Sequence, residues 1–248
     1  MGATVCRAVA DDPALELVAA VDPGAAGEKV AKVAGVDADF EVAGKSEHLE
    51  VIPQVMVDFT HLDAARHNLA WCAANGVHAV VGTTGFTDAD LESFREGFTT
   101  SNCLIAPNFA IGAILMMRFA ELAAPWFETA EVLEFHHDAK IDSPSGTAMR
   151  TVERMAAASP DWASDPTTTD VIPGARGGEG PGGIHIHAVR MRGMVAHQEV
   201  VLGTTGQTLS IRHDSYDRSS FMPGVVLACK RIADHPGVTV GLDSFLEL

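Results

Sequence analysis

The sequence predicts an α/β protein in which a parallel sheet flanked by helices precedes an α+β domain with a mixed sheet. In the first hundred residues, short apolar runs alternate with helical patterns, which is typical of a parallel sheet with helices on its faces. After residue 108 the order changes to one long apolar helix and then several strands in succession. We therefore expect a first domain of residues 1–109 and 217–248 and a second domain of residues 110–216.

Four apolar runs in the first domain are predicted to be buried strands. They are LELVAAVD (15–22), VMVDFT (55–60), HAVVGTTG (78–85) and CLIAPNF (103–109). Helices are expected between them, over Asp63–Asn75 and Asp88–Phe98. Ligands of open parallel sheets bind outside the carboxyl ends of the strands. We expect a binding crevice at these ends, which carry small or polar residues: Asp22, Phe59-Thr60, Gly82-Thr83-Thr84 and Pro107-Asn108.

The second domain is predicted to combine two helices with a run of strands. Helices are expected over Ala110–Ala124 and Thr147–Ala158, with a strand at Val132–His136 between them. Residues 159–183 are rich in Pro, Gly, Thr and Asp and predict a long loop. Three antiparallel strands are expected next, at residues 184–191, 195–203 and 207–213. A last helix at 221–234 and a short strand at 238–240 are expected to return to the first domain.

Composition excludes several classes of function. The chain of 248 residues carries 33 Asp and Glu against 17 Lys and Arg, and a net charge of −16 argues against nucleic-acid binding. Its longest apolar run, Phe109–Met117, is too short to span a bilayer, and we expect no leader peptide. The four cysteines are too far apart in sequence for a metal knuckle or a redox pair. We expect a cytoplasmic protein with free thiols and no membrane partner.

The opening MGATVCRAVADDPALELVAAVD predicts a helix followed by a strand. A dinucleotide-binding fold begins instead with a strand and a glycine-rich turn, of which Gly2 alone could be the last glycine. Asp22 lies 20 residues further on, where an acidic residue binds the ribose hydroxyls of a dinucleotide. A Rossmann-like sheet without its first strand is therefore expected. Three explanations compete: a start codon assigned too late, which we prefer, a fragment of a longer protein, or a protein that lacks the loop.

The stretch EFHHDAKIDSPSGTA (134–148) places two histidines, a lysine and an aspartate just before a predicted helix start. Free N–H groups and the helix dipole make such a start an anion site, and Gly146 lets a ligand approach the backbone. The alternative for Ser145-Gly146-Thr147 is an ordinary N-cap by Ser145.

The two histidines of this stretch are expected to have different roles. His136 and His137 point to opposite sides if they end a strand, because consecutive strand residues alternate. A histidine near its pKa suits general acid catalysis, and Lys140 could pair with a carboxylate or deliver a proton. Asp142 either orients Lys140 or stabilises the loop.

No metal site is expected, although His136-His137, His185 and His187 were considered as zinc ligands. Adjacent histidines rarely bind one ion, and cysteines at ligand spacing are missing. His185 and His187 fall on one side of a predicted strand, where they could form a polar strand face.

These residues also carry a resemblance to a known family. EVLEFHHDAKIDSPSGTA (131–148) closely resembles the signature of the 4-hydroxy-tetrahydrodipicolinate reductases, formerly dihydrodipicolinate reductases, of bacterial lysine and diaminopimelate biosynthesis. Further segments that resemble the family are VVGTTGF (80–86), APNFAIG (106–112), VAHQEV (195–200) and RHDSYDRSSF (212–221). The similarity covers nearly the whole chain and is greatest to the actinobacterial enzymes.

The resemblance implies an oxidoreductase that passes hydride from NADH or NADPH to a small cyclic dicarboxylate, giving tetrahydrodipicolinate. By position, His136 is implied as the proton donor or acceptor and Lys140 as the second proton donor. The implied substrate-binding residues are His137, Ser145, Gly146 and Thr147. The implied cofactor-binding residues are Met1, Gly2, Asp22, Gly82, Thr83, Thr84, Ala106, Pro107, Asn108 and Phe109. The resemblance also implies a homotetramer built through the sheet of the second domain.

The sequence departs from the family at its start, where members carry a strand and a glycine-rich loop that holds the pyrophosphate. We expect poor folding or weak NAD(P)H binding of the chain as written, because that strand lies in the middle of the sheet. The departure supports an alternative function, a cofactor-deficient pseudoenzyme or substrate-binding subunit. A different nicotinamide-linked dehydrogenase is a third interpretation. No arginine stands next to Asp22, which favours NADH over NADPH.

Overall fold

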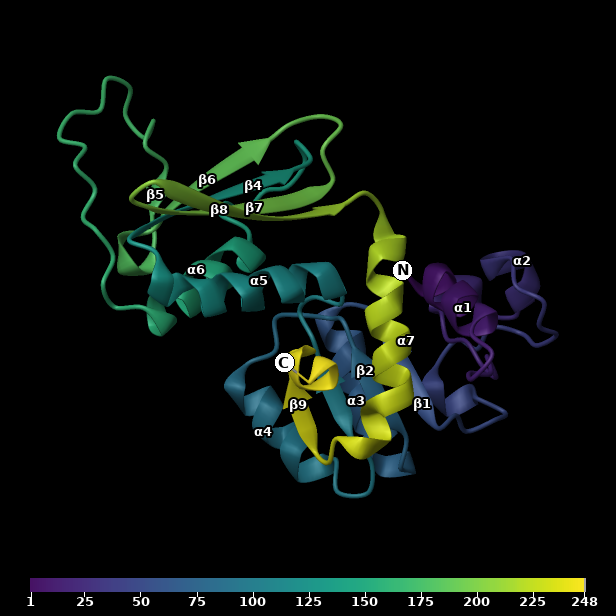
Figure 1. Cartoon of the computed structure of the whole chain (residues 1–248). Coiled ribbons are helices and arrows are strands. Elements are labelled where there is room, and N and C mark those ends of the chain that lie inside the picture. The colour runs from purple at the N-terminus through teal and green to yellow at the C-terminus, as the bar shows by residue number, and fades with distance from the viewer. Residues whose placement is uncertain (248) are drawn as a thin grey trace. The chain divides into compact units, whose positions relative to one another are not determined.

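The computed structural model describes residues 1–247, which form two compact units (Figure 1). Unit 1 contains Met1–Ala110 and the chain from Arg218 onwards, and unit 2 contains Ile111–Asp217. Unit 1 carries a parallel sheet and unit 2 a mixed sheet, and each sheet packs against helices. The predicted α/β class with its two kinds of sheet is confirmed.

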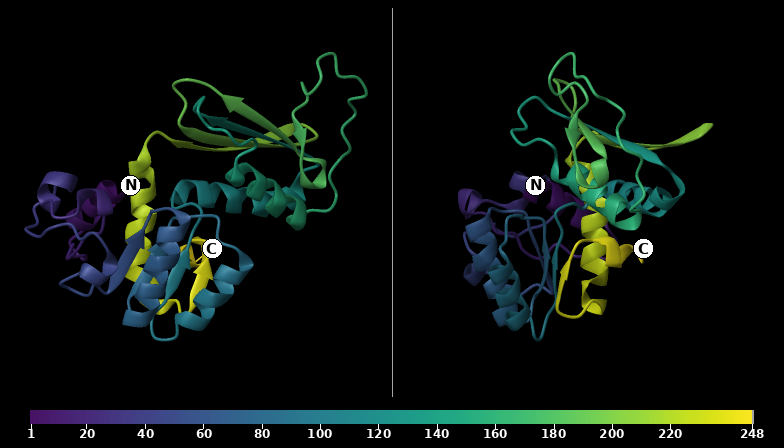
Figure 2. Two further views of the ribbon diagram at one scale, coloured as in Figure 1. Left: turned by 180° about the vertical axis from the view of Figure 1, so that it is seen from behind. Right: turned by 90° about the vertical axis from the view of Figure 1, so that its left-hand side faces the viewer.

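The sheet of unit 1 has four parallel strands in the order β1-β2-β3-β9. Their bounds are Val55–Asp58, His78–Val81, Cys103–Ile105 and Val238–Val240. Helices α3 and α4 cover one face of the sheet and α7 covers the other (Figure 2, right). These helices span Leu62–Asn75, Asp88–Gly97 and Met222–Arg231. The predicted return of the last helix and strand to the first sheet is confirmed.

Local sequence sets where α3 and α4 begin and end. A capping box starts α4, since the Thr87 hydroxyl accepts the Asp90 N–H and the Asp90 carboxylate accepts the Thr87 N–H. Arg66 of α3 donates two hydrogen bonds to that carboxylate, at 2.8 and 2.9 Å, and so joins the two helices. Gly76 ends α3 in the left-handed conformation, at φ 68°, that glycine adopts without strain.

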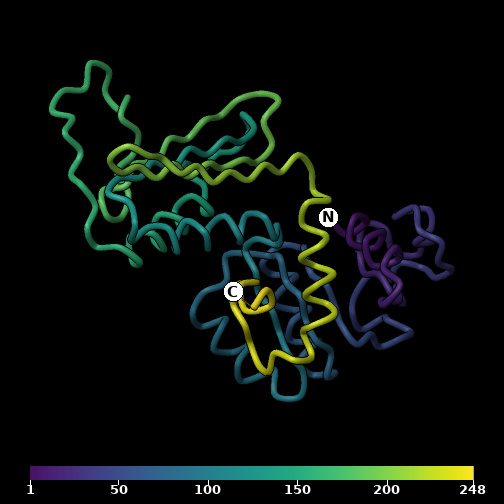
Figure 3. Tube along the Cα trace, in the orientation of Figure 1, coloured from purple at the N-terminus to yellow at the C-terminus, as the bar shows by residue number. Residues whose placement is uncertain are grey.

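The segment Leu15–Asp22 is not the buried strand that the sequence predicts. Helix α1 (Gly2–Asp11) precedes it as expected, and the short α2 (Val30–Ala34) follows it. The segment is extended and largely half-exposed, and its single bridge joins Val21 to Ala43 (Figure 3). The prediction is wrong because a strand needs ladder partners, and no strand among residues 1–247 pairs with the other edge of this segment.

A cavity of about 450 Å³ lies in unit 1 along this segment and along β1. Apolar side chains dominate its lining, among them Val5 and Val9 of α1 and Leu17 of the extended segment. Strand β1 is an edge strand of the sheet, and all its residues line the cavity. Gly2 and Asp22 line the same cavity, which brings the two ends of the predicted dinucleotide pattern together.

The sheet of unit 2 has five strands in the order β5-β6-β4-β7-β8. In that order they span Gly178–Glu179, His185–Arg190, Thr129–His136, Ala196–Thr204 and Gln207–Ser215. Strand β4 runs parallel to β6 and antiparallel to β7, which in turn pairs with β8. The prediction of three successive antiparallel strands is therefore wrong in part. The strand order depends on long-range pairing, because β4 pairs along its whole length with β7 and so separates β7 from β6.

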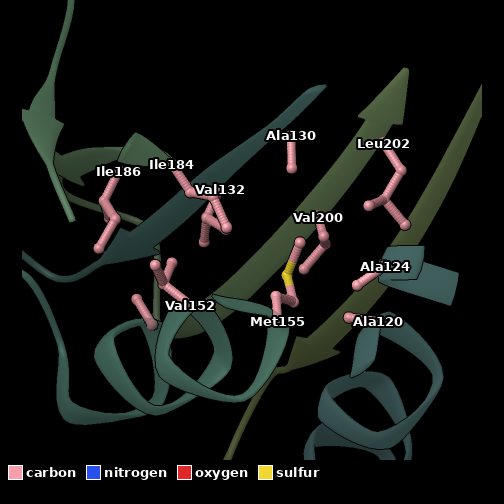
Figure 4. Close-up of a cluster of buried hydrophobic side chains, with 11 residues drawn as sticks. Ala120, Ala124, Ala130, Val132, Val152, Met155, Ile184, Ile186, Val200 and Leu202 are labelled. Atoms are coloured by element: carbon pink, nitrogen blue, oxygen red, sulfur yellow. The ribbon is translucent and has the colours of Figure 1, made fainter. Parts of the chain in front are cut away.

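Helices α5 (Ile111–Ala123) and α6 (Gly146–Ala158) lie against one face of this sheet (Figure 4). The buried cluster between them includes Ala120, Ala124, Ala130, Val132, Val152, Met155, Ile184, Ile186, Val200 and Leu202. The even-numbered residues of β4 face these helices, because strand side chains alternate. The same alternation places Glu134 and His136 on the helix side and Glu131 on the other side.

The long loop over residues 159–183 is held to the outer side of the sheet by an ionic cluster. Arg176 Nη1 donates to Glu131 Oε2 at 2.9 Å, and its Nε lies 3.0 Å from Asp165 Oδ2. His187 Nε2 lies 2.7 Å from Glu131 Oε2, and His185 Nε2 lies 3.4 Å from Asp165 Oδ2. His185 and His187 thus contact the carboxylates of Asp165 and Glu131, and both of these carboxylates also bind Arg176.

Short 3-10 turns complete the chain at Pro23–Ala25, Ser46–His48, Ala124–Trp126, Pro181–Gly183, Arg218–Phe221, Ile232–Asp234 and Asp243–Leu246. Within residues 1–247, none of the helices has the length and apolar character that crossing a membrane requires. All four cysteines are free thiols, and three of them are buried. Burial raises the pKa of Cys72 and of Cys229 to about 12, so these two are unreactive at neutral pH.

Gly224 of α7 tests how tightly unit 1 is packed. A Cβ at this position would lie 2.1 Å from the Phe109 carbonyl oxygen and 3.0 Å from Leu242 Cδ2. Gly224→Ala should therefore lower the free energy of unfolding by about 1–3 kcal/mol, although alanine favours a helix by about 1 kcal/mol over glycine. Gly97→Ala in α4 is the control, because its Cβ would meet Ala73 at an ordinary 3.4 Å. Urea unfolding that places both variants at the wild-type midpoint would contradict this packing.

Candidate active site

His136 is the last residue of β4, and its imidazole is 16% exposed. Its Nδ1 lies 2.5 Å from Oε2 of Glu134, two residues earlier on the same side of the strand. Since the Glu134 carboxylate can only accept when ionised, Nδ1 carries the hydrogen of this bond. Nε2 is therefore the imidazole nitrogen left for exchanging a proton with a ligand.

Glu134 is a fully buried carboxylate with a complete set of donors. Arg190 of β6 donates to both oxygens, each at 2.8 Å, and the backbone N–H of Ser145 donates to Oε1 at 3.1 Å. Burial alone raises the pKa of Glu134, but the hydrogen bonds from Arg190 and His136 outweigh burial and lower it. The side chain is thus a paired anion at neutral pH, the condition under which a buried charge is tolerated.

The pKa of His136 is lowered from its ordinary value of 6.5. Burial is the main cause, and the positive charges of Lys140 and Arg190 add to it, whereas Glu134 raises the pKa in part. The imidazole is therefore mostly neutral at pH 7 but keeps a carboxylate that stabilises the imidazolium. Such a group can pass a proton in either direction, as general acid–base catalysis requires.

Lys140 lies in the turn that follows β4, and its ammonium is bound by Asp142. Nζ lies 2.6 Å from Oδ1 and 2.7 Å from Oδ2 of that carboxylate. Arg190 Nη2 donates to the Asp142 carbonyl oxygen at 2.8 Å and so ties the turn to the buried Glu134. Of the two roles that the sequence left open for Asp142, orientation of Lys140 is the one that this geometry supports.

The start of α6 combines both interpretations of Ser145-Gly146-Thr147. Ser145 Oγ accepts the Ala148 N–H at 3.2 Å, which is an ordinary N-cap. The N–H groups of Gly146 and Thr147 donate to no acceptor among residues 1–247. A Cβ at Gly146 would meet no atom within 4 Å and Gly146 is exposed, so a ligand can approach the helix start. The helix start can therefore bind a carboxylate close to its backbone.

The structure brings some predicted residues together and leaves others apart. His136, Lys140 and the start of α6 all connect to Glu134 or Arg190. The His137 side chain is exposed beyond the strand end and joins this network only through its carbonyl, which accepts the Lys140 N–H. Neither Glu134 nor Arg190 is among the site residues that the sequence predicts. Glu134 had a signal, a carboxyl two residues before His136 on one strand side, but Arg190 had none because its position depends on the β4–β6 register.

In unit 1, the start of α1 and Asp22 are residues that the sequence predicts to bind a dinucleotide. The N–H groups of Gly2 and Ala3 donate to no acceptor in the described chain, whereas the Met1 carbonyl accepts from Thr4 and Val5. Asp22 Oδ1 accepts the Gly24 N–H at 2.8 Å, which fixes the carboxylate along the cavity. Free N–H groups at a helix start can donate to a phosphate, and a carboxylate can accept from ribose hydroxyls.

The predicted cofactor residues after β2 serve partly as structure. Gly82 lies against the Phe59 ring, since a Cβ there would come within 2.1 Å of that ring. Thr83 is buried, and its hydroxyl donates to Asp58 Oδ1 at 3.0 Å. Thr84 is exposed and is the residue of this turn that is open to a ligand.

The turn after β3 shows a similar division. Ala106 and Phe109 are buried, at 0% and 2% exposure. Pro107 is exposed and Asn108 is half-buried, with its Oδ1 accepting the Ala110 N–H at 2.9 Å. Among these four residues, Pro107 and Asn108 are therefore the accessible ones.

Two family models match consecutive parts of the chain. The model described as dihydrodipicolinate reductase, N-terminus, matches residues 1–109, and that described as dihydrodipicolinate reductase, C-terminus, matches residues 112–246. The chain belongs to the dihydrodipicolinate reductase family. The resemblance inferred from residues 131–148 is thereby confirmed.

Individual relatives agree with this family. The chain is 46% identical to the 4-hydroxy-tetrahydrodipicolinate reductase of Corynebacterium urealyticum and 48% identical to that of Nocardia farcinica. In both cases the alignment covers 100% of this chain and 95% of the relative. The solved dipicolinate-bound dihydrodipicolinate reductase from Paenisporosarcina sp. TG-14 is 37% identical, with a TM-score of 0.85 over 97% of this chain and 93% of that one.

This chain also shares its fold with a solved amine dehydrogenase from Mycobacterium smegmatis, with a TM-score of 0.62 at 13% identity. The alignment covers 98% of this chain and 93% of that one. Similarity at this level extends to the architecture alone, because one fold supports many reactions.

Gly146→Val tests the open space in front of α6. A Cβ there meets no atom within 4 Å, and the branched side chain would crowd the helix start that carries the free N–H groups of Gly146 and Thr147. Affinity for a small cyclic dicarboxylate should fall about 10- to 100-fold, as expected when charge-assisted hydrogen bonds are lost. Gly178→Val in β5 is the matched control, because a Cβ there also meets nothing within 4 Å. Calorimetry that finds the same dicarboxylate affinity for both variants would show that the anion binds elsewhere.

Proposed function

We propose that this chain catalyses the reduction of 4-hydroxy-tetrahydrodipicolinate to tetrahydrodipicolinate with NADH or NADPH, in lysine and diaminopimelate biosynthesis. The observation that carries the proposal is the arrangement in unit 2. A proton-exchanging His136, an oriented Lys140 and the free N–H groups of α6 all connect to one buried ion pair. The family, and relatives that bear the name of this reductase, support the same reaction.

The residues of unit 2 divide the work of binding and proton transfer. When bound, NADH or NADPH supplies the hydride, and a hydride that reaches a ring carbon needs a matching proton. His136 Nε2 is the proton donor or acceptor, and Lys140 is the second proton donor. We assign the binding of one substrate carboxylate to the N–H groups of Gly146 and Thr147 and to the His137 side chain.

Lys140 has a carboxylate partner that a substrate can replace. Asp142 is 59% exposed, and its pKa is lowered chiefly by the hydrogen bond from Lys140. A substrate carboxylate offers the ammonium the same charge and the same two oxygens. We therefore assign Asp142 the role of holding Lys140 ready until the substrate binds.

The cofactor-binding residues proposed in unit 1 are those of the sequence prediction. The cavity is lined by Gly2 and Asp22, and Met1 precedes Gly2 in the chain. The accessible residues at the carboxyl ends of β2 and β3 are Thr84, Pro107 and Asn108. Weak NAD(P)H binding by the chain as written stays a prediction. The alternative of a cofactor-deficient pseudoenzyme is not favoured, because relatives named as reductases align with the whole chain.

Assembly and location are also part of the proposal. A homotetramer formed through the sheet of unit 2 is supported by half-buried Leu133 and Phe135 on the outer side of β4. Strand β8 pairs only with β7 among residues 1–247, which leaves its other edge open.

A cytoplasmic location is supported by four free cysteines, since reducing compartments keep thiols unpaired.

His136→Gln and Lys140→Ala test the proton transfers. Each variant should lower kcat by about 10²- to 10⁴-fold, because each removes a group that donates a proton in the transition state. The Kd for NADH should stay at the wild-type value, because these groups belong to unit 2 and not to the proposed cofactor residues. His48→Gln and Lys29→Ala are matched controls on the surface of unit 1 and should retain full activity. Wild-type kcat in either active-site variant would refute its assigned role.

Asp22→Ala tests the cofactor preference. The carboxylate should bind the ribose hydroxyls of NADH and repel the 2′-phosphate of NADPH. The variant should lose about tenfold in NADH affinity and should keep or gain NADPH affinity, and fluorescence titration with both cofactors measures the difference. Asp37→Ala, an exposed acid in the same unit, controls for the change in net charge. Equal losses for the two cofactors would contradict a ribose contact, and the wild-type titration also measures whether binding is weak.

A further inference from the structure

We propose that Glu134 and Arg190 are the positioning residues of this active site, fixing the imidazole of His136 and the anion-binding start of α6 with one carboxylate. The proposal rests on the function proposed above and concerns two residues that are not among those predicted from the sequence. It stands on the hydrogen bonds of the two carboxylate oxygens.

The two oxygens of Glu134 hold different parts of the site. Oε2 accepts from His136 Nδ1, so the imidazole is held in the tautomer that leaves Nε2 free. Oε1 accepts the N–H of Ser145, the residue directly before the free N–H groups of Gly146 and Thr147. The proton donor and the anion site are therefore placed relative to each other by a single planar group.

Arg190 fixes the orientation of the Glu134 carboxylate. Its two terminal nitrogens donate to the two oxygens in a bidentate pair, which allows the carboxylate one orientation. The Nε–H of Arg190 is buried and has no partner in the described chain. The guanidinium thus leaves one of its own donors unsatisfied while Nη2 serves both Glu134 and the Asp142 carbonyl.

A purely structural ion pair is the competing interpretation, and the chain contains a matched example of one. Glu131 lies on the opposite side of β4 and binds Arg176 and His187 as Glu134 binds Arg190 and His136. The hydrogen bonds from Arg176 and His187 outweigh burial and lower the pKa of Glu131 as well. Glu131 faces away from α6, so it shares the chemistry of Glu134 without touching the candidate site.

Glu134→Gln separates the two interpretations, with Glu131→Gln as control. Glutamine has one carbonyl oxygen, so it can accept from His136 or from Ser145 but not from both. We expect kcat to fall about 10- to 100-fold in Glu134→Gln and to stay within about twofold in Glu131→Gln. The charged groups that face His136 are Glu134, Lys140 and Arg190, so loss of the anion leaves two cations. The pKa of His136 should fall further, and the alkaline loss of kcat/KM should move to lower pH in Glu134→Gln alone.

Nitrogen-15 NMR of labelled histidine gives a readout that does not depend on turnover. The wild type should show His136 as the Nδ1–H tautomer, and Glu134→Gln should show a mixture of tautomers or a lower titration midpoint. Arg190→Lys, which keeps the charge but loses the bidentate pair, is a second variant in case Glu134→Gln does not fold. Arg190→Lys should lower kcat as Glu134→Gln does.

The outcomes distinguish failure of this inference from failure of the proposed function. Unchanged NMR signals and pH profile in Glu134→Gln, or an equal loss of kcat in Glu131→Gln, would overturn the positioning role. A changed tautomer in a protein whose wild type lacks reductase activity would keep the positioning role and overturn the proposed function.

Discussion

The ion pair between Glu134 and Arg190 is the interaction on which the arrangement of the candidate site depends. A carboxylate with no exposed surface costs several kcal/mol unless donors surround it. Its donors come from β4, β6 and the start of α6, so burying this charge forces the three elements to meet. Stability and chemistry are thereby linked, because the same hydrogen bonds that permit burial orient His136 and Ser145.

Unit 1 also buries a carboxylate, and the donors that surround it are neutral. Asp58, at the carboxyl end of β1, is 3% exposed and accepts hydrogen bonds from Thr60, Thr83 and Asn68. No cation compensates this carboxylate among residues 1–247, and its hydroxyl and amide donors join the ends of β1 and β2. Buried Asp58 therefore organises the edge at which a parallel sheet binds ligands, as Glu134 organises the end of β4.

Local patterns were predictable from the sequence, and long-range pairing was not. Residues 134–148 predicted His136, Lys140 and the anion site, because capping, strand alternation and proton chemistry are all read within one stretch. The Arg190 contact depends on the parallel β4–β6 register, which no local signal specifies. The same limit explains the misplaced strand order in unit 2. Leu15–Asp22 carries a strand composition, but composition supplies no ladder partner, so the segment stays extended with a single bridge.

The affinity of Glu134→Gln for a small cyclic dicarboxylate tests most directly whether one carboxylate places both the imidazole and the start of α6. We expect calorimetry to show binding at least about tenfold weaker than in the wild type, because the Ser145 turn loses its acceptor or shares it with His136. Glu131→Gln should bind as the wild type does. Wild-type affinity in Glu134→Gln, in a protein whose circular dichroism shows it folded, would contradict the link between the ion pair and the anion site.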